Sequence, residues 1–127
     1  MSKILITGAN RGIGLELSRQ LVSRGDEVIA VCRSASEELM SLNLRVIEGI
    51  DVCADQSISS LQTQLGGEKL DWLINNAGIL SVESLDSLDF GTMEQQFRVN
   101  ALGPLRTTAA LLQNLPSGSK VGIMTSR

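Results

Sequence analysis

The stretch of sequence that decides the fold is Lys3-Ile4-Leu5-Ile6-Thr7-Gly8-Ala9-Asn10-Arg11-Gly12-Ile13-Gly14. A short apolar run ends in a threonine and three glycines, and apolar residues then recur at helical spacing. This order predicts a buried strand, a tight turn and the first turn of a helix. Glycines let a backbone approach a ligand closely, and free N–H groups at a helix start attract phosphate. The stretch therefore predicts a nucleotide diphosphate site, against the alternative of an ordinary glycine turn.

The composition of the chain limits its class and its partners. The 127 residues are 43% hydrophobic and 20% charged, which is typical of one globular domain over residues 1–127. The net charge of −3 comes from both signs scattered along the chain, so neither a nucleic-acid nor a membrane partner is indicated. Three apolar residues after Lys3 are too few for a signal peptide.

The two cysteines, Cys32 and Cys53, stand far apart in a chain that has no histidine, so no metal site is predicted. We expect both to be reduced residues of a cytoplasmic protein.

Further apolar runs and helical periods alternate along the chain. Strands are expected near residues 4–6, 28–32, 44–50, 70–75 and 121–125, separated by helices near 12–24, 34–43, 55–65 and 89–114. Strands that alternate with helices require right-handed crossovers and a parallel sheet. We expect an α/β fold, a Rossmann-like parallel sheet of five strands in the order 3-2-1-4-5, with helices on both faces and truncated after the fifth strand.

Every predicted strand ends in a polar or glycine-containing group. These ends are Thr7-Gly8, Cys32-Arg33, Asp51-Val52, Asn75-Asn76-Ala77-Gly78 and Thr125-Ser126. In an open parallel sheet, ligands bind beyond the carboxyl ends of the strands, near the point where the strand order reverses. Each group alone also suits an ordinary turn. All of them on one rim indicate a ligand site.

These motifs resemble the short-chain dehydrogenase/reductase family, in its compact single-domain branch. The turn reads T-G-x-x-x-G-x-G rather than the common G-x-G-x-x-G, and N-N-A-G follows at 75–78. The resemblance implies that the turn holds a cofactor pyrophosphate, with contacts from Thr7, Gly8, Asn10, Arg11, Gly12, Ile13 and Gly14. It places Asp51 and Val52 beside the adenine. It places Asn76, Ala77 and Gly78 along the ribose and nicotinamide.

The charges near the second strand favour NADP over NAD. Sites that select NAD place an acid at the end of this strand to bind the ribose 2′-hydroxyl, whereas NADP sites place arginine nearby. This chain has Arg33 there, no acid before Glu37, and Arg11 inside the glycine turn. Guanidinium groups bind phosphate through a rigid fork of donors. The alternative for each arginine is a solvated surface charge.

The resemblance also implies two catalytic residues. Ser126 would polarise the carbonyl of a small-molecule carbonyl or alcohol substrate, and Asn100 would support a proton relay. Pro104 has no N–H to bond the Asn100 carbonyl. Either this carbonyl holds a water, as in the family, or the proline only kinks the helix.

The resemblance fails at the proton donor. The family's reaction needs a tyrosine followed four residues later by a lysine, and the chain has no tyrosine and ends at Arg127. We expect the cofactor-binding part of an NADP-dependent oxidoreductase, inactive as given. The alternative is a non-catalytic nucleotide-binding or partner-binding module.

Two apolar surfaces predict a homo-oligomer. The fifth strand is apolar at Val121, Ile123 and Met124, and as an edge strand it would offer a template for pairing. The long helix carries an apolar stripe that would lie partly uncovered, formed by Met93, Phe97, Ala101, Leu105, Ala109 and Leu112.

Overall fold

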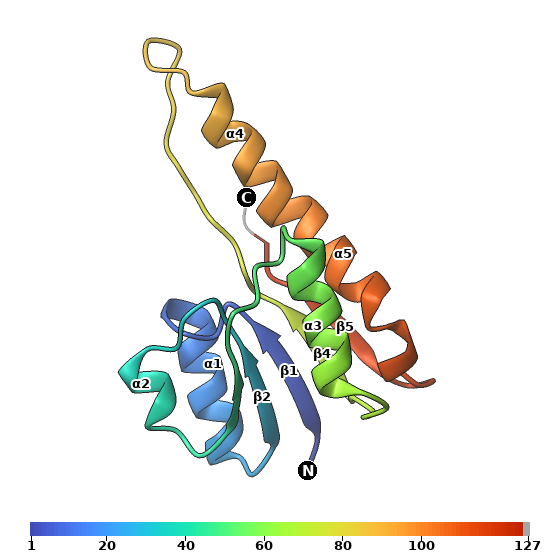
Figure 1. Ribbon diagram of the computed structural model, residues 1–127. Helices are drawn as coiled ribbons and strands as arrows, with labels where there is room; N and C mark the ends of the chain where they lie inside the picture. Colours follow the sequence, from blue (N-terminus) through green and yellow to red (C-terminus); the bar gives the residue numbers. More distant parts are fainter. Residues whose placement is uncertain (126–127) are drawn as a thin grey trace.

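Aliphatic runs form the central strands because the sheet buries them on both faces. The structure is a computed structural model that describes residues 1–125. Within these residues the strands are β1 (Lys3–Thr7), β2 (Glu27–Val31), β3 (Arg45–Ile47), β4 (Trp72–Asn75) and β5 (Lys120–Ile123). They pair in parallel in the order β3-β2-β1-β4-β5 (Figure 1). This confirms the predicted fold and strand order.

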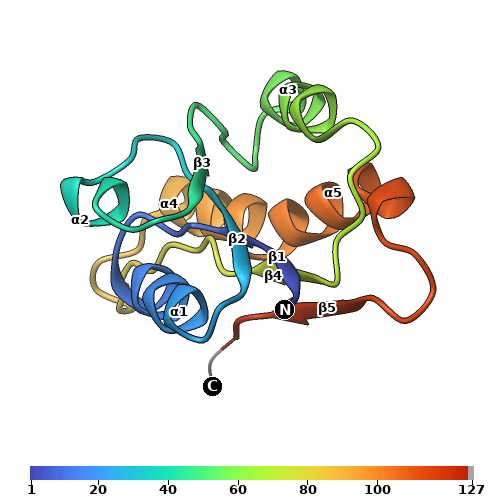
Figure 2. The ribbon, with the colours of Figure 1, turned by 90° about the horizontal axis from the view of Figure 1, so that it is seen from below.

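Helices pack on both faces of the sheet (Figure 2). On one face, α1 (Gly12–Ser23) and α2 (Glu37–Met40) cover alternate strand residues such as Ile4 and Val28. On the other face, α3 (Asp55–Leu65) and α5 (Gly103–Ala110) cover the residues between them, such as Leu5 and Ile29. Each strand residue therefore belongs to one of two cores, as its position in the pleat dictates.

The face that α1 covers is not covered evenly. Trp72 and Ile74 of β4 are only half-buried there, beside the well-covered β1 and β2. The Lys120 ammonium lies 5.2 Å from the centre of the Trp72 ring, at the cation–π distance. Within the described residues, the Trp72 ring thus has the Lys120 ammonium as a neighbour where the other strands have an apolar layer.

The long helical stretch predicted over residues 89–114 is divided into four pieces. It consists of α4 (Phe90–Phe97), a π-helical turn (Arg98–Leu102), α5 and a 3₁₀ turn (Leu112–Asn114). Pro104 stands in the first turn of α5, where its missing N–H is tolerated. The wider π turn directly before it lets the Gly103 N–H bond the Arg98 carbonyl instead of following the regular ladder.

The apolar stripe of this stretch faces outward. Phe97 is 59% exposed and Leu105 is 66% exposed, while the face that packs on the sheet presents Gly103, Thr107 and Leu111. The helical stretch therefore packs on the sheet through Gly103, Thr107 and Leu111 and leaves Phe97 and Leu105 uncovered.

Several predicted boundaries were wrong, including α2, which spans Glu37–Met40 rather than 34–43, and β4, which begins at Trp72 rather than Leu70. The third strand ends at Ile47 rather than Ile50, because Gly49 has a φ of +76° and turns the chain out of the pleat. The amide of Ile50 still bonds the Cys32 carbonyl, which keeps this segment beside β2. The fifth strand ends at Ile123 rather than Thr125.

One buried amide fastens the connection between α3 and β4. Asn114 is fully buried, and its Nδ2 donates to the carbonyls of Gly66 (2.9 Å) and Glu68 (2.7 Å). The backbone carbonyl of Asn114 accepts from the amide of Leu70 at 2.8 Å. These hydrogen bonds hold the segment between α3 and β4 against the 3₁₀ turn.

We expect Asn114→Ala to lower the free energy of unfolding by about 1–3 kcal/mol, the scale of two lost hydrogen bonds. Gln113→Ala removes an exposed neighbouring side chain and should change it by less than about 0.5 kcal/mol. Urea denaturation followed by circular dichroism measures both. Equal values for the two variants would contradict this role of Asn114.

Candidate functional site

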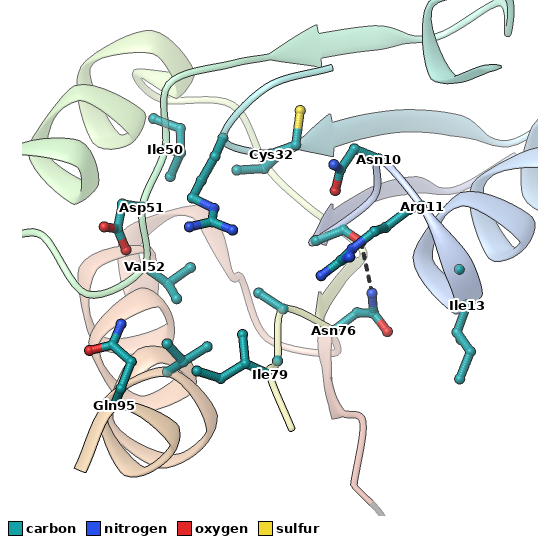
Figure 3. Close-up of a pocket in the computed structure, with 17 residues that line it drawn as sticks. Asn10, Arg11, Ile13, Cys32, Ile50, Asp51, Val52, Asn76, Ile79 and Gln95 are labelled. Carbon is teal, nitrogen blue, oxygen red and sulfur yellow. Dashed lines mark hydrogen bonds between the residues drawn. The ribbon is translucent and has the colours of Figure 1, made fainter. Parts of the chain in front are cut away.

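A cleft of about 900 Å³ opens at the carboxyl ends of the strands, near the point where the strand order reverses between β1 and β4. Its walls come from the glycine turn, the ends of β2 and β4, the segment after β3, and α4 with the π turn (Figure 3). The volume falls in the range of small-molecule and cofactor sites. The predicted position of a ligand site is therefore hollow.

The three glycines of the turn occupy their positions for different physical reasons. A Cβ on Gly8 would lie 2.7 Å from the Cα of Ala77, and one on Gly14 would lie 2.3 Å from the Gly8 carbonyl oxygen. Both positions therefore require glycine because protein backbone passes there. Gly12 has a φ of +56°, but a Cβ there would meet nothing within 4 Å. Gly12 faces the cleft, so the open space next to it belongs to the site.

Thr7 joins the ends of the two central strands. Its buried Oγ1 accepts from the amides of Asn76 (3.0 Å) and Ala77 (3.1 Å). In return, Asn76 Nδ2 donates to the Gly8 carbonyl at 3.0 Å. The glycine turn and the end of β4 thus form one unit, although nearly seventy residues of sequence separate them.

The segment after β3 is fixed from two sides. Asp51 accepts from the amide of Cys53 at 2.9 Å and so closes a local turn. Arg106 of α5 donates to the Val52 carbonyl at 3.0 Å and pairs with Asp55 at 3.1 Å. Val52 is buried because its methyl group fills the space beside Gly103, where a Cβ would approach it to 2.8 Å.

Two guanidinium groups border the cleft. Arg11 reaches over it from the glycine turn (Figure 3), and Arg33 lines it from the end of β2. Both residues are exposed, and within residues 1–125 neither guanidinium makes a hydrogen bond or an ion pair. Next to them, Ser36 donates to the Asn10 carbonyl at 2.5 Å and caps α2 through the amide of Leu39. The loops that carry the two arginines are therefore fixed while the charges remain free.

A second, smaller hollow of about 490 Å³ lies on the other side of the β4 end. It shares Ile13 and residues 76–79 with the cleft, and it adds Leu80, Asn100, Pro104 and residues 123–125. The Asn100 side chain here holds the backbone of Ile79, accepting from its N–H (2.9 Å) and donating to its carbonyl (2.7 Å). Ser126, the other predicted catalytic residue, lies outside the described residues.

Most of the predicted cofactor residues line the cleft. Thr7 and Gly14 do not, because they lie behind it and shape the turn. Several residues that line the cleft were not among the predicted cofactor residues, although Cys32 was placed at the end of the second strand. They are Val31, Cys32, Ile50, Ile79, Gln95 and Val99. The residues at or directly after strand ends follow from the rule that ligands bind beyond the carboxyl ends of parallel strands. Gln95 and Val99 do not, since only the tertiary packing brings α4 to this rim.

Cys32 is the one cysteine that lines the cleft within the described chain. Burial, with a smaller contribution from Glu48, raises the pKa of its thiol. The group is therefore an uncharged, small apolar wall at neutral pH.

The comparison with known proteins identifies the family. The chain matches the short chain dehydrogenases over residues 2–125. It belongs to this family of oxidoreductases. In the family, the T-G-x-x-x-G-x-G turn and the N-N-A-G end of β4 are recurring motifs, and in this chain they meet through Thr7, Gly8 and Asn76.

Relatives of this short-chain dehydrogenase chain include enzymes and solved structures. It is 40% identical over 129 residues to 1-hydroxy-2-glutathionyl-2-methyl-3-butene dehydrogenase from Rhodococcus sp. (strain AD45), covering all of this chain and 57% of that protein. It is 32% identical to retinol dehydrogenase 8 from Bos taurus, covering 88% of this chain and 39% of that protein. A carbonyl reductase from Pseudomonas aeruginosa PAO1, solved with NADP, superposes with a TM-score of 0.89 at 32% identity, covering 100% of this chain and 59% of that one.

The chain thus spans between 39% and 59% of the length of these relatives. No helix within residues 1–125 is long and apolar enough to cross a membrane.

We expect alanine at Gly8 or Gly14 to destabilise the protein more than alanine at Gly12. Gly8→Ala combines left-handed strain with a backbone clash, roughly 2–5 kcal/mol, whereas Gly12→Ala adds the strain alone, about 1–2 kcal/mol. Gly14→Ala carries the clash without the strain, and its effect should exceed that of Gly12→Ala as well. Denaturation midpoints of the three variants check this order, and a Gly12→Ala variant as unstable as Gly8→Ala would refute it.

Proposed function

We propose that this chain is the cofactor-binding part of an NADP-dependent oxidoreductase of the short-chain dehydrogenase type. The observation that carries the proposal is the pair of guanidinium groups, Arg11 and Arg33, which lie at the rim of the cleft without a partner among residues 1–125. A phosphate on the ribose 2′-oxygen supplies the charge that two such groups lack, and guanidinium forks match phosphate geometry.

The glycine turn supports the same ligand. Gly12 stands at the start of α1 beside open space, and helix N-termini attract phosphate. We assign the pyrophosphate to the turn from Gly8 to Gly14, the adenine to Asp51 and Val52, and the ribose and nicotinamide to Asn76, Ala77 and Gly78. The carbonyl reductase solved with NADP supports this assignment through its similarity to the whole chain.

The cofactor would supply hydride exchange at its nicotinamide with a small-molecule carbonyl or alcohol. The residues of this chain would orient the cofactor and shape the second hollow, where Asn100 holds the wall next to the nicotinamide end. Ser126 would polarise the substrate carbonyl. The proton-donating tyrosine of the family is not among the 127 residues, so we place the complete activity in a protein that includes further residues.

The absence of tyrosine from these residues also favours a second function, a non-catalytic nucleotide-binding module. The two functions can be distinguished by assaying a protein whose sequence continues beyond Arg127. Oxidation of NADPH by carbonyl compounds would support the oxidoreductase. NADPH binding without turnover would support the module.

We also propose a cytoplasmic location. The free Cys32 and Cys53 support it, since thiols stay reduced in that compartment.

We expect the unmodified chain to bind NADPH more tightly than NADH. Arg33→Ala should weaken NADPH binding by about 1.5–3 kcal/mol, the scale of hydrogen bonds to charged groups, and leave NADH binding almost unchanged. Titration followed by the fluorescence of the reduced nicotinamide measures both cofactors. Arg19→Ala is the matched control, because Arg19 is an exposed arginine of α1 that pairs with Glu16 away from the cleft.

Equal affinity of the unmodified chain for NADH and NADPH would refute the proposed selectivity. A loss of both cofactors in Arg33→Ala would show that Arg33 supports the cleft as a whole and does not read the 2′-phosphate.

We propose that the chain forms a homo-oligomer through one of two apolar surfaces. One is the stripe of α4 and α5 that includes Phe97 and Leu105, and the other is the edge at β5, where Ile123 is 57% exposed. Exposed apolar patches and open strand edges both favour association.

Light scattering at several concentrations should show association of the unmodified chain. Leu105→Glu should reduce it if the helix stripe is the contact, and Met124→Lys should reduce it if the strand edge is. A monodisperse monomer of the unmodified chain at high concentration would refute the proposal.

A further inference from the structure

The segment that leaves β4 runs beside α4 (Figure 1). Side chains tie it at regular intervals to α4 and to the π turn. Four-residue spacing places the helix residues on one face, and two-residue spacing places those of the extended segment on one side. The paired residues are Asn100 with Ile79, Gln96 with Ser81 and Thr92 with Glu83. We call this set of pairs the ladder.

The middle pair of the ladder is Gln96 with Ser81. Its Oε1 accepts from the amide of Ser81 at 3.2 Å, and its Nε2 donates to the Ser81 hydroxyl at 2.7 Å. One side-chain amide thus fixes both the backbone and the side chain of Ser81. It repeats, four residues earlier on the helix, the two-bond contact that Asn100 makes with Ile79.

The outer pair of the ladder, Thr92 with Glu83, depends on the Glu83 carboxylate. Glu83 Oε1 accepts from the Ser81 hydroxyl at 2.5 Å and lies 2.6 Å from Thr92 Oγ1. The hydroxyl hydrogen bonds from Ser81 and Thr92 lower the pKa of the Glu83 carboxyl, so it remains an acceptor at neutral pH. Ser81 links this outer pair to the middle pair, because the Ser81 hydroxyl also accepts from Gln96 Nε2.

The inner end of the ladder is a wall of the site. Ile79 lines both the cleft and the second hollow, and it follows directly on the N-N-A-G end of β4. Asn100 Oδ1 also lies 3.2 Å from the position that a Cβ on Gly78 would occupy. A shift of the extended segment along α4 would therefore move the wall that the two hollows share.

We propose that Gln96 is a positioning residue for the nicotinamide end of the cofactor, and that Thr92 and Glu83 complete the ladder through which it acts. Gln96 lines neither hollow and acts by fixing the register of Ile79. This inference rests on the proposed NADP function. It concerns only the nicotinamide end, because Arg11, Arg33 and Asp51 border the other part of the cleft.

Two ligands separate this role from a general structural one. NADPH reaches the Ile79 wall, whereas adenosine 2′,5′-bisphosphate carries the adenine and the 2′-phosphate but no nicotinamide. Gln96→Ala should weaken NADPH binding about three- to tenfold, the range of neutral hydrogen bonds, and leave bisphosphate binding unchanged. Thr92→Val, which keeps the side-chain shape, should give a smaller loss in the same pattern. Glu94→Ala, an exposed position of α4, should change neither ligand.

Fluorescence titration measures NADPH, calorimetry measures the bisphosphate, and circular dichroism checks folding. If Gln96→Ala does not fold, Thr92→Val decides. A parallel loss of both ligands, or no loss of either, would overturn the positioning role. If the unmodified chain binds neither ligand, the proposed function fails and this inference fails with it. If the unmodified chain binds both ligands and only the Gln96→Ala result disagrees, the proposed function stands alone.

Discussion

The rest of the site depends on the contact between Thr7 and the end of β4. One buried hydroxyl oxygen accepts from two successive amides, and this ties the end of β1 to the residues directly after β4. The strand order reverses between β1 and β4, and the cleft opens at this switch point of the parallel sheet. It also brings the glycine turn so close to β4 that Gly8 and Gly14 have no room for a side chain. Much of what looks like a ligand motif in the sequence is therefore a packing requirement of the protein itself.

The site is built with two sets of polar groups that have different tasks. Thr7, Ser36, Asn100 and Arg106 hold the strand ends and loops in place through bonds within the protein. Arg11 and Arg33 have no such bonds within residues 1–125. A ligand that binds groups on a fixed frame loses less free energy to ordering the protein. This division supports a preorganised cleft rather than one that closes around its ligand.

The sequence predicted the features that local physics determines. Unbroken aliphatic runs specify strands buried on both faces, and the glycine turn specifies the strand-to-helix junction, so the sheet order and most lining residues followed. The contacts of Gln96 and Ser81 could not be predicted, because nothing in the loop after β4 fixes its register against a helix residue fifteen positions away. The stripe of Phe97 and Leu105 was recognisable, but which face of the helix packs on the sheet depends on the small residues of α5.

The uneven cover of the sheet has an optical consequence. Trp72 is the single tryptophan of the sequence, and it lies half-buried on the thinly covered face, with the Lys120 ammonium over its ring. Its emission therefore reports the polarity at β4 and β5, on the side of the sheet that α1 and α2 leave open. Any layer that comes to lie over these strands would displace water from the indole and move its emission to shorter wavelength. The emission of Trp72 therefore indicates whether this face of β4 and β5 is covered.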